Sequence, residues 1–147
     1  MATTGSGANL SLRIVRKFSH PREEVFAAWS EASALSRWFA PSDEYRTVAT
    51  ADVRPGGEYR IEMHHKGGNV HVALGRYVEI VRPSKLVFSW GWDEPSGASD
   101  TLVTVEFHDF GRETEVVIVH ERFPNDETRD KHEQGWNACL SRLTEKL

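Results

Sequence analysis

The stretch from Asn125 to the C-terminus most strongly constrains how this chain can fold. Its apolar residues recur at helical spacing and form one stripe along one face of a predicted helix: Trp136, Cys139, Leu140, Leu143 and Leu147. Charged side chains occupy much of the remaining surface, and Asn125 can cap the start of the helix. A helix with one apolar stripe needs a broad apolar surface against it. The rest of the chain must supply that surface.

Alternating apolar and polar residues predict strands along most of the chain. A first strand is predicted at Leu10–Phe18, and six more near 46–53, 57–65, 70–81, 85–92, 101–108 and 113–121. The breaks between the later strands are short and rich in glycine and proline, which favours antiparallel hairpins. One face of the sheet carries large apolar side chains and the other is mostly polar, so we expect the sheet to be covered on one side.

The segment between the first two strands predicts two short helices, which end before Pro41. Pro21 suits the first turn of a helix. Large apolar residues then recur on one helical face in two groups, Val25, Phe26 and Trp29, followed by Leu35, Trp38 and Phe39. The predicted order is therefore one strand, two short helices, six strands and one long helix, which is an α+β fold.

Length and charge narrow the class of protein. A chain of 147 residues fits one domain, and we predict a disordered tail at residues 1–9 followed by a single domain at 10–147. The net charge of −4 comes from interspersed signs without a basic block, so neither nucleic acid nor a membrane surface is expected as a partner. No apolar run approaches the roughly 18 residues of a membrane span, and no signal peptide precedes the first strand. A cytoplasmic location is expected.

The sequence offers no convincing metal or cofactor site. His64 and His65 are adjacent, so in a strand they face opposite sides, and no set of Cys or carboxylate ligands completes a site around them. Phosphate loops, dinucleotide fingerprints and nucleophile elbows are absent from the sequence. Cys139, the only cysteine, lies on the apolar stripe and is expected to be a packing thiol. We therefore expect no metal and no cofactor.

Five segments in a fixed order carry a resemblance to a known family: HPREEVFAAWSEASALSRWFAP, RPGGEYRIEM, GRYVEIVRPSKLVFSW, TLVTVEFHDFGRETEVVIVHERF and GWNACLSRLTEKL. From about Leu12 to Leu147 the chain resembles the homologues of the activator of the ninety-kilodalton heat-shock protein's ATPase. That family belongs to the START-like, or SRPBCC, superfamily of helix-grip proteins. The resemblance implies a curved antiparallel sheet of about six to seven strands wrapped on the C-terminal helix, with a deep pocket between them.

What the resemblance implies about function is broader. Members of the family are mostly binders of small ligands, stress-related proteins or uncharacterised, and some superfamily relatives are cyclases or hydrolases. The eukaryotic co-chaperone has an additional N-terminal domain that binds the chaperone. Because only about nine residues precede the first predicted strand, we do not expect a chaperone partner.

His120 is the best single candidate for a catalytic role. It has the same parity as Val116 and Ile118, so it is expected to point inward near the end of the last strand. There it would hydrogen-bond a ligand, act as a general acid or base, or satisfy a buried group as a structural residue. The sequence leaves these alternatives open.

A set of large side chains is predicted to line the pocket with His120: Trp38, Tyr59, Met63, Phe88, Trp90 and Trp136. Plain core packing is the alternative for each of them. Gly135 adds a related question, because a glycine inside a helix costs about 1 kcal/mol relative to alanine. It either allows close approach to a strand or leaves room for a ligand beside Trp136.

Three hypotheses follow. The first is a protein that binds a small hydrophobic or aromatic molecule between sheet and helix, with a role in the stress response. The second is a cyclase- or hydrolase-type enzyme that uses His120. The third is an interaction module for a chaperone or for a homodimer. It needs an exposed apolar patch on the outer face of the sheet or along an edge strand, for which Leu102, Val117 and Val119 are the candidates.

Overall fold

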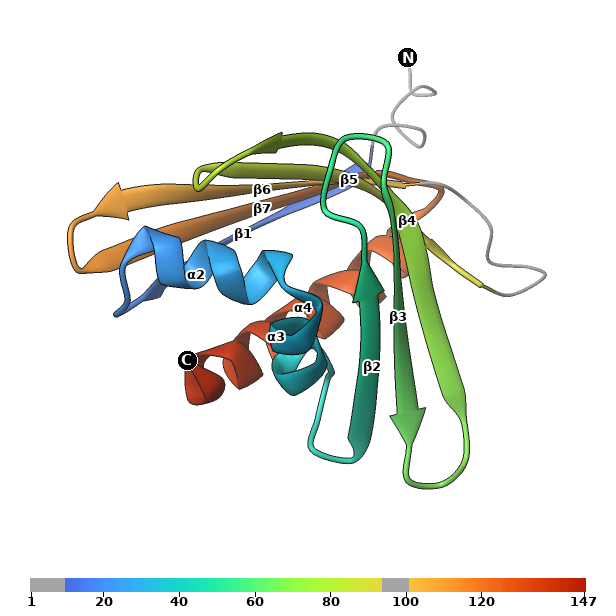
Figure 1. Ribbon diagram of the computed structural model, residues 1–147. Helices are drawn as coiled ribbons and strands as arrows, with labels where there is room; N and C mark the ends of the chain where they lie inside the picture. Colours follow the sequence, from blue (N-terminus) through green and yellow to red (C-terminus); the bar gives the residue numbers. More distant parts are fainter. Residues whose placement is uncertain (1–9, 94–100) are drawn as a thin grey trace, which may run out of the picture.

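A computed structural model describes residues 10–93 and 101–147 (Figure 1). The predicted tail at 1–9 lies outside the described residues, as does most of the break predicted between the strands near 85–92 and 101–108. The strands are β1 (Leu10–Phe18), β2 (Tyr45–Ala51), β3 (Glu58–His65), β4 (Val70–Val81), β5 (Lys85–Trp92), β6 (Thr101–Phe110) and β7 (Glu113–Phe123). The helices are α2 (Arg22–Ser30), α3 (Ala32–Trp38) and α4 (Asp126–Lys146).

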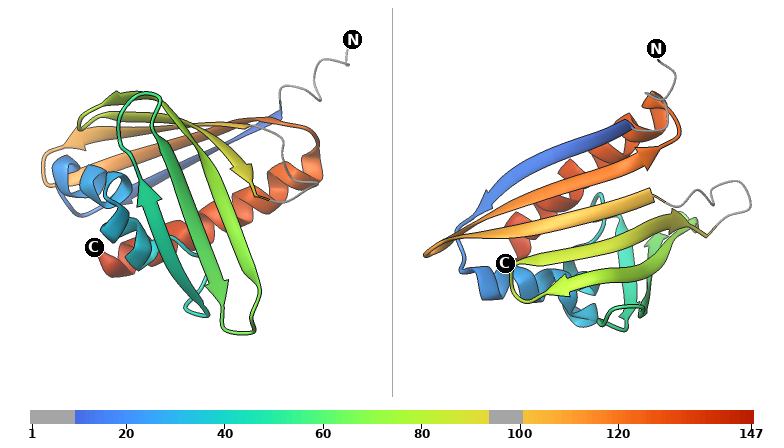
Figure 2. Two further views of the ribbon diagram at one scale, coloured as in Figure 1. Left: turned by 45° about the vertical axis from the view of Figure 1, so that its right-hand side comes forward. Right: turned by 90° about the horizontal axis from the view of Figure 1, so that it is seen from above.

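The strands of the described residues form one antiparallel sheet of seven strands, in the order β1-β7-β6-β5-β4-β3-β2. The sheet bends strongly between its β1 end and its β2 end, and α4 runs inside the bend (Figures 1 and 2). This arrangement confirms the predicted helix-grip fold, with two short helices after the first strand. Each of the strands β2 to β6 is paired with the next strand along the chain, as the short breaks between them predicted.

Helix α4 begins as the sequence predicted. The side-chain oxygen of Asn125 accepts a hydrogen bond from the backbone N–H of Thr128 at 2.8 Å, which caps the helix. The predicted stripe supplies the buried residues of α4, namely Trp136, Cys139, Leu140 and Leu143. Leu147 is partly buried against the same core. The helix is therefore fixed to the sheet through one face.

The inner face of the sheet forms most of the core. In β7, Thr114, Val116, Ile118 and His120 point inward and are fully buried, as their common parity predicted. The pairing of β4 with β5 shifts between Tyr77 and Glu79, so β4 carries a β-bulge. Glu79 lies on the outside of this bulge, where it pairs with Lys85 at 3.1 Å.

The two short helices close one end of the bend. Between them, Glu31 is extended, with φ −104° and ψ 129°, which separates α2 from α3. The indole N–H of Trp38 donates to the carbonyl oxygen of Ala28 at 2.8 Å and ties the two helices together. The hydroxyl of Ser36 accepts from the backbone N–H of Ala49 at 3.0 Å, so α3 satisfies an amide on the edge strand β2.

Two strands are longer than predicted. β6 continues to Phe110 and β7 begins at Glu113, because the two-residue turn between them lets the strands pair along their full length. β7 also extends to Phe123, whose side chain is fully buried. Arg122 has φ 74° and is the extra residue where the pairing with β1 shifts, so a β-bulge ends this strand.

Candidate ligand-binding site

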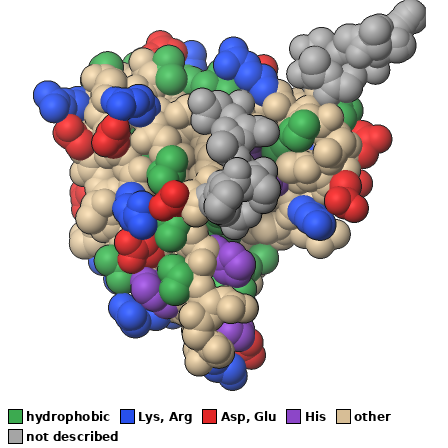
Figure 3. All heavy atoms as spheres, turned by 90° about the vertical axis from the view of Figure 1, so that its right-hand side faces the viewer, with side chains coloured by type: hydrophobic (Ala, Val, Ile, Leu, Met, Phe, Trp, Pro, Cys, Tyr) green, Lys and Arg blue, Asp and Glu red, His purple; other side chains and the backbone are tan. Residues whose placement is uncertain are grey.

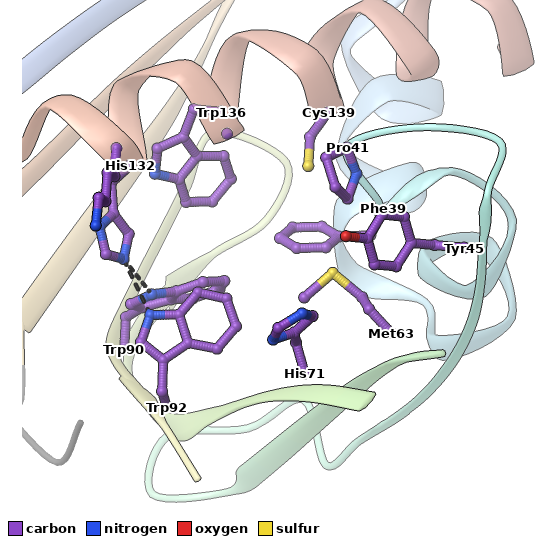
Figure 4. Close-up of a pocket in the computed structure, with 12 residues that line it drawn as sticks. Phe39, Pro41, Tyr45, Met63, His71, Trp90, Trp92, His132, Trp136 and Cys139 are labelled. Atoms are coloured by element: carbon purple, nitrogen blue, oxygen red, sulfur yellow. Dashed lines mark hydrogen bonds between the residues drawn. The ribbon is translucent and has the colours of Figure 1, made fainter. Parts of the chain in front are cut away.

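A pocket of about 270 Å³ lies between the sheet and the part of α4 from Lys131 to Cys139 (Figure 4). It is lined by Phe39, Pro41, Tyr45, Met63, His71, Trp90, Trp92, Lys131, His132, Gly135, Trp136 and Cys139. These residues come from the segment after α3, from β2 to β5, and from one face of α4. The lining is mostly aromatic and apolar, which is the character of sites for small organic molecules.

Three aromatic rings form one wall of the pocket. The ring centroids of Trp90 and Trp136 lie 5.5 Å apart, and Phe39 lies 5.7 Å from Trp136 and 5.9 Å from Trp90. Tilted and edge-on contacts at these distances are favourable for aromatic pairs. The three rings fix one another, so this wall is already formed without an occupant.

His132 joins α4 to the end of β5. Its Nδ1 lies 2.8 Å from the carbonyl oxygen of Thr128, which can only accept, so Nδ1 carries the proton and donates. Its Nε2 then accepts from the indole N–H groups of Trp90 at 3.3 Å and Trp92 at 3.2 Å (Figure 4). Burial lowers the pKa of His132, against the opposing effect of the hydrogen bond to Thr128. His132 is therefore held as a neutral acceptor.

His120 lies in a closed network next to this wall. The indole N–H of Trp136 donates to its Nδ1 at 3.0 Å, so its Nε2 carries the proton and donates to the hydroxyl of Thr101 at 2.6 Å. The Thr101 hydroxyl donates in turn to the carbonyl oxygen of Trp90 at 3.0 Å. Burial, and then the neighbouring His132, lower the pKa of His120 to about 2. Both ring nitrogens are engaged, and His120 is not among the residues that line the pocket.

Gly135 sits in the pocket lining at the middle of α4. Apart from the adjacent residues Gln134 and Trp136 and the backbone of α4 itself, a Cβ added at this position would meet no atom within 4 Å among the described residues. Of the two explanations open from the sequence, close approach to a strand is therefore wrong. The missing side chain adds empty space to the pocket beside Trp136.

The pocket contains part of the residue set predicted from the sequence. Met63, Trp90 and Trp136 line it. Tyr59 and Phe88 instead face an inner cavity of only about 20 Å³, which is separated from the pocket by Phe39 and Trp90. Trp38 is buried against α2, and His120 lies in the network described above.

Several residues of the site were not predicted as ligand-binding: Phe39, Pro41, Tyr45, His71, Trp92, Lys131, His132 and Cys139. Two of them could have been found from spacing. His132 precedes Trp136 by four residues and so shares its helix face, and Trp92 has the parity of Trp90. Burial raises the pKa of the Cys139 thiol to about 12, so this side chain forms part of the apolar wall.

Histidine side chains gather near one end of the face shown in Figure 3, among hydrophobic and charged side chains. His65 pairs with Glu44 at 3.1 Å, and His64 with Glu62 at 3.1 Å. Within residues 10–93 and 101–147, no three His, Cys, Asp or Glu side chains come together as a metal site would require. In the same residues, no helix has the length and apolar character needed to cross a membrane.

A curved antiparallel sheet that closes on a long C-terminal helix, with an apolar pocket between them, defines the helix-grip class of proteins. The family model described as "Activator of Hsp90 ATPase homolog 1-like protein" matches residues 19–147, and the chain belongs to this family. The family predicted from the sequence is thereby confirmed. No curated protein matches the chain.

Solved bacterial structures share the fold over nearly the whole chain. A protein from Chromobacterium violaceum is 26% identical with a TM-score of 0.81, covering 92% of this chain and 94% of its own. A protein from Rhizobium leguminosarum is also 26% identical, with a TM-score of 0.79 and 92% of each chain covered. The AHSA1 protein from Silicibacter pomeroyi is 24% identical with a TM-score of 0.83, covering 93% of this chain and 96% of its own.

Proposed function

We propose that this protein binds a small aromatic or hydrophobic molecule in the pocket between the sheet and α4. The observation that carries the proposal is the empty space at Gly135. A glycine inside a helix costs about 1 kcal/mol relative to alanine. Here no close contact with another element explains it, because a Cβ would meet nothing within 4 Å among the described residues beyond Gln134, Trp136 and the backbone of α4 itself. The helix is thus less stable than it needs to be, at a position where a side chain would narrow the pocket.

The size and walls of the pocket support the same proposal. A volume of about 270 Å³ corresponds to roughly nine water molecules at about 30 Å³ each. That space accommodates a body of one or two rings and is at the small end of ligand sites. The rings of Phe39, Trp90 and Trp136 offer faces on which an aromatic ligand can stack. A role in the stress response and a cytoplasmic location stay predictions from the sequence.

Blocking the pocket tests the proposal. Tryptophan fluorescence and thermal unfolding are followed while one- and two-ring aromatic compounds are added, because Trp90, Trp92 and Trp136 line the pocket. A ligand at a hundred times its Kd stabilises the folded state by about 2.7 kcal/mol. We expect saturable quenching and a raised Tm for the wild type, and loss of both in Gly135→Leu, whose side chain fills the pocket.

Gln134→Leu is the matched control, since Gln134 is exposed on the same helix and does not line the pocket. This variant should bind like the wild type. The proposal fails if no compound in the panel binds the wild type. It also fails if Gly135→Leu folds and binds as tightly as Gln134→Leu does.

A further inference from the structure

Among the described residues, the polar groups of the pocket lining include hydrogen-bond donors and cations but no carboxylate. Lys131, Trp90 and Trp92 contribute only N–H donors, and no carboxylate of the described residues lines the pocket. The remaining polar side chains are those of Tyr45, His71 and His132. A ligand with hydrogen-bond acceptors would find donors in this lining, and a cationic ligand would find no opposite charge.

Apart from the two histidines, Lys131 is the only residue of the described lining that can carry a positive charge. Its side chain is 74% exposed, so it stands at the rim. Among the described residues, one carboxylate forms an ion pair with its ammonium group. This is the carboxylate of Glu127, which lies 3.9 Å away and belongs to a side chain that is 81% exposed. An ion pair so long and so exposed is weak. Among the described residues, no strong ion pair therefore holds the ammonium group, which can turn toward an anion in the pocket.

Trp92 supplies a donor that is poorly satisfied. The Nε2 of His132 has one lone pair in the ring plane, yet two indole N–H groups point at it, from 3.3 Å and 3.2 Å. Because Nδ1 of His132 is committed to Thr128, no tautomer gives a second acceptor. Trp90 is buried and Trp92 is half-buried, so the N–H of Trp92 is the one that can move to another acceptor. A hydrogen bond to a charged oxygen is about twice as strong as one between neutral groups.

We infer that the occupant of the pocket is a compact aromatic anion, with a carboxylate as its head group. The ring body lies against Phe39, Trp90 and Trp136, and the head group lies at the rim near Lys131 and the N–H of Trp92. This inference rests on the proposed function, since it names the chemical class of the ligand for the same pocket. A neutral aromatic alcohol of the same shape keeps the ring contacts and loses the charge interaction.

Three probes with one ring system test the inference: 2-naphthoate, 2-naphthylmethanol and 2-naphthylmethylammonium. Their Kd values are measured by calorimetry at low and high salt. For the wild type we expect naphthoate to bind roughly tenfold more tightly than the alcohol and the ammonium compound to bind most weakly. Salt should weaken naphthoate binding and leave the alcohol unchanged.

Two variants separate the contributions. Lys131→Gln should weaken naphthoate about three- to fivefold and leave the alcohol unchanged, whereas Lys146→Gln, at the far end of the same helix, should change neither. Trp92→Phe removes the N–H and keeps a ring, so it should reduce the preference for naphthoate over the alcohol. If all three probes bind with equal Kd, or if Lys131→Gln keeps the full preference, the head group is wrongly assigned while the proposed function stands. If none of the three probes binds the wild type while another compound of the aromatic panel does, the inference fails and the proposed function stands. If no compound of the panel binds, neither survives.

Discussion

The two halves of α4 serve different purposes, although both face the same sheet. In the second half, Leu140 and Leu143 are fully buried and pack into a closed core. In the first half, His132, Gly135 and Trp136 face a cavity. The second half gains stability from complete packing, whereas the first gives up helix propensity at Gly135 and keeps space. One helix therefore both anchors the fold and forms a wall of the site.

Leu143→Ala should have the largest effect on stability. The side chain of Leu143 is fully buried, and truncating such a residue leaves a cavity that costs about 2–5 kcal/mol. Urea unfolding followed by circular dichroism measures the loss. Leu147→Ala, at the partly buried end of the same stripe, should lose clearly less. If Leu143→Ala costs under about 1 kcal/mol, the second half of α4 is not the closed core described above.

The pH dependence of stability should show the burial of His120. Burial lowers the pKa of His120 in the folded state to about 2, whereas the unfolded chain takes up this proton near the ordinary histidine pKa of 6.5. Below that value the unfolded state binds more protons, so stability is lost as pH falls, by about 1.4 kcal/mol per pH unit. Urea unfolding at pH 7, 6 and 5 measures the slope.

His120→Gln should reduce this slope by about 1.4 kcal/mol per pH unit, which corresponds to one bound proton. Any loss of stability that does not depend on pH adds to this effect. His108→Gln is the control, because His108 is an exposed histidine that pairs with Glu106. Equal slopes for wild type and His120→Gln would mean that His120 is accessible to protons in the folded state, contrary to its place in the network.

Gly135→Ala should have the smallest effect and the opposite sign. Its methyl group meets no atom within 4 Å among the described residues, and alanine is favoured over glycine in a helix by about 1 kcal/mol. We expect a Tm higher by about 2–4 °C, measured by scanning calorimetry. A lower Tm would show that the helix backbone at Gly135 is packed against something, and the contrast between the two halves of α4 would be lost.

The fold could be predicted from the sequence because its signals are local. Alternation of apolar and polar residues within each strand indicates which side chains point inward. The short breaks between strands are long enough for antiparallel hairpins and too short for parallel crossovers. The β-bulge at Tyr77 to Glu79 is different, because it depends on how β4 bends over β5. Parity along the sequence does not reveal where such a shift falls.

The site could be predicted only in part, for a related reason. Alternation tells which side chains point inward, but not what covers them. Tyr59 and Phe88 point inward like Met63 and Trp90, yet they face the small inner cavity, which Trp29 and Leu35 of the short helices also line. Tyr45 and His71 join the pocket because of the curvature of the sheet, for which the sequence carries no simple signal.

The position of β1 has a consequence for the kinetics of folding. Strands β2 to β7 pair with their neighbours along the chain, so they can form as a local meander. Among the described strands β1 pairs only with β7, and Leu10 pairs with Phe123 across most of the chain. Closing such long-range contacts slows folding, because the loop entropy is lost before the contacts form. During synthesis β1 emerges before the other six strands of this sheet and lacks its partner until β7 has followed, so we expect β1 to be the last of the seven to join the sheet.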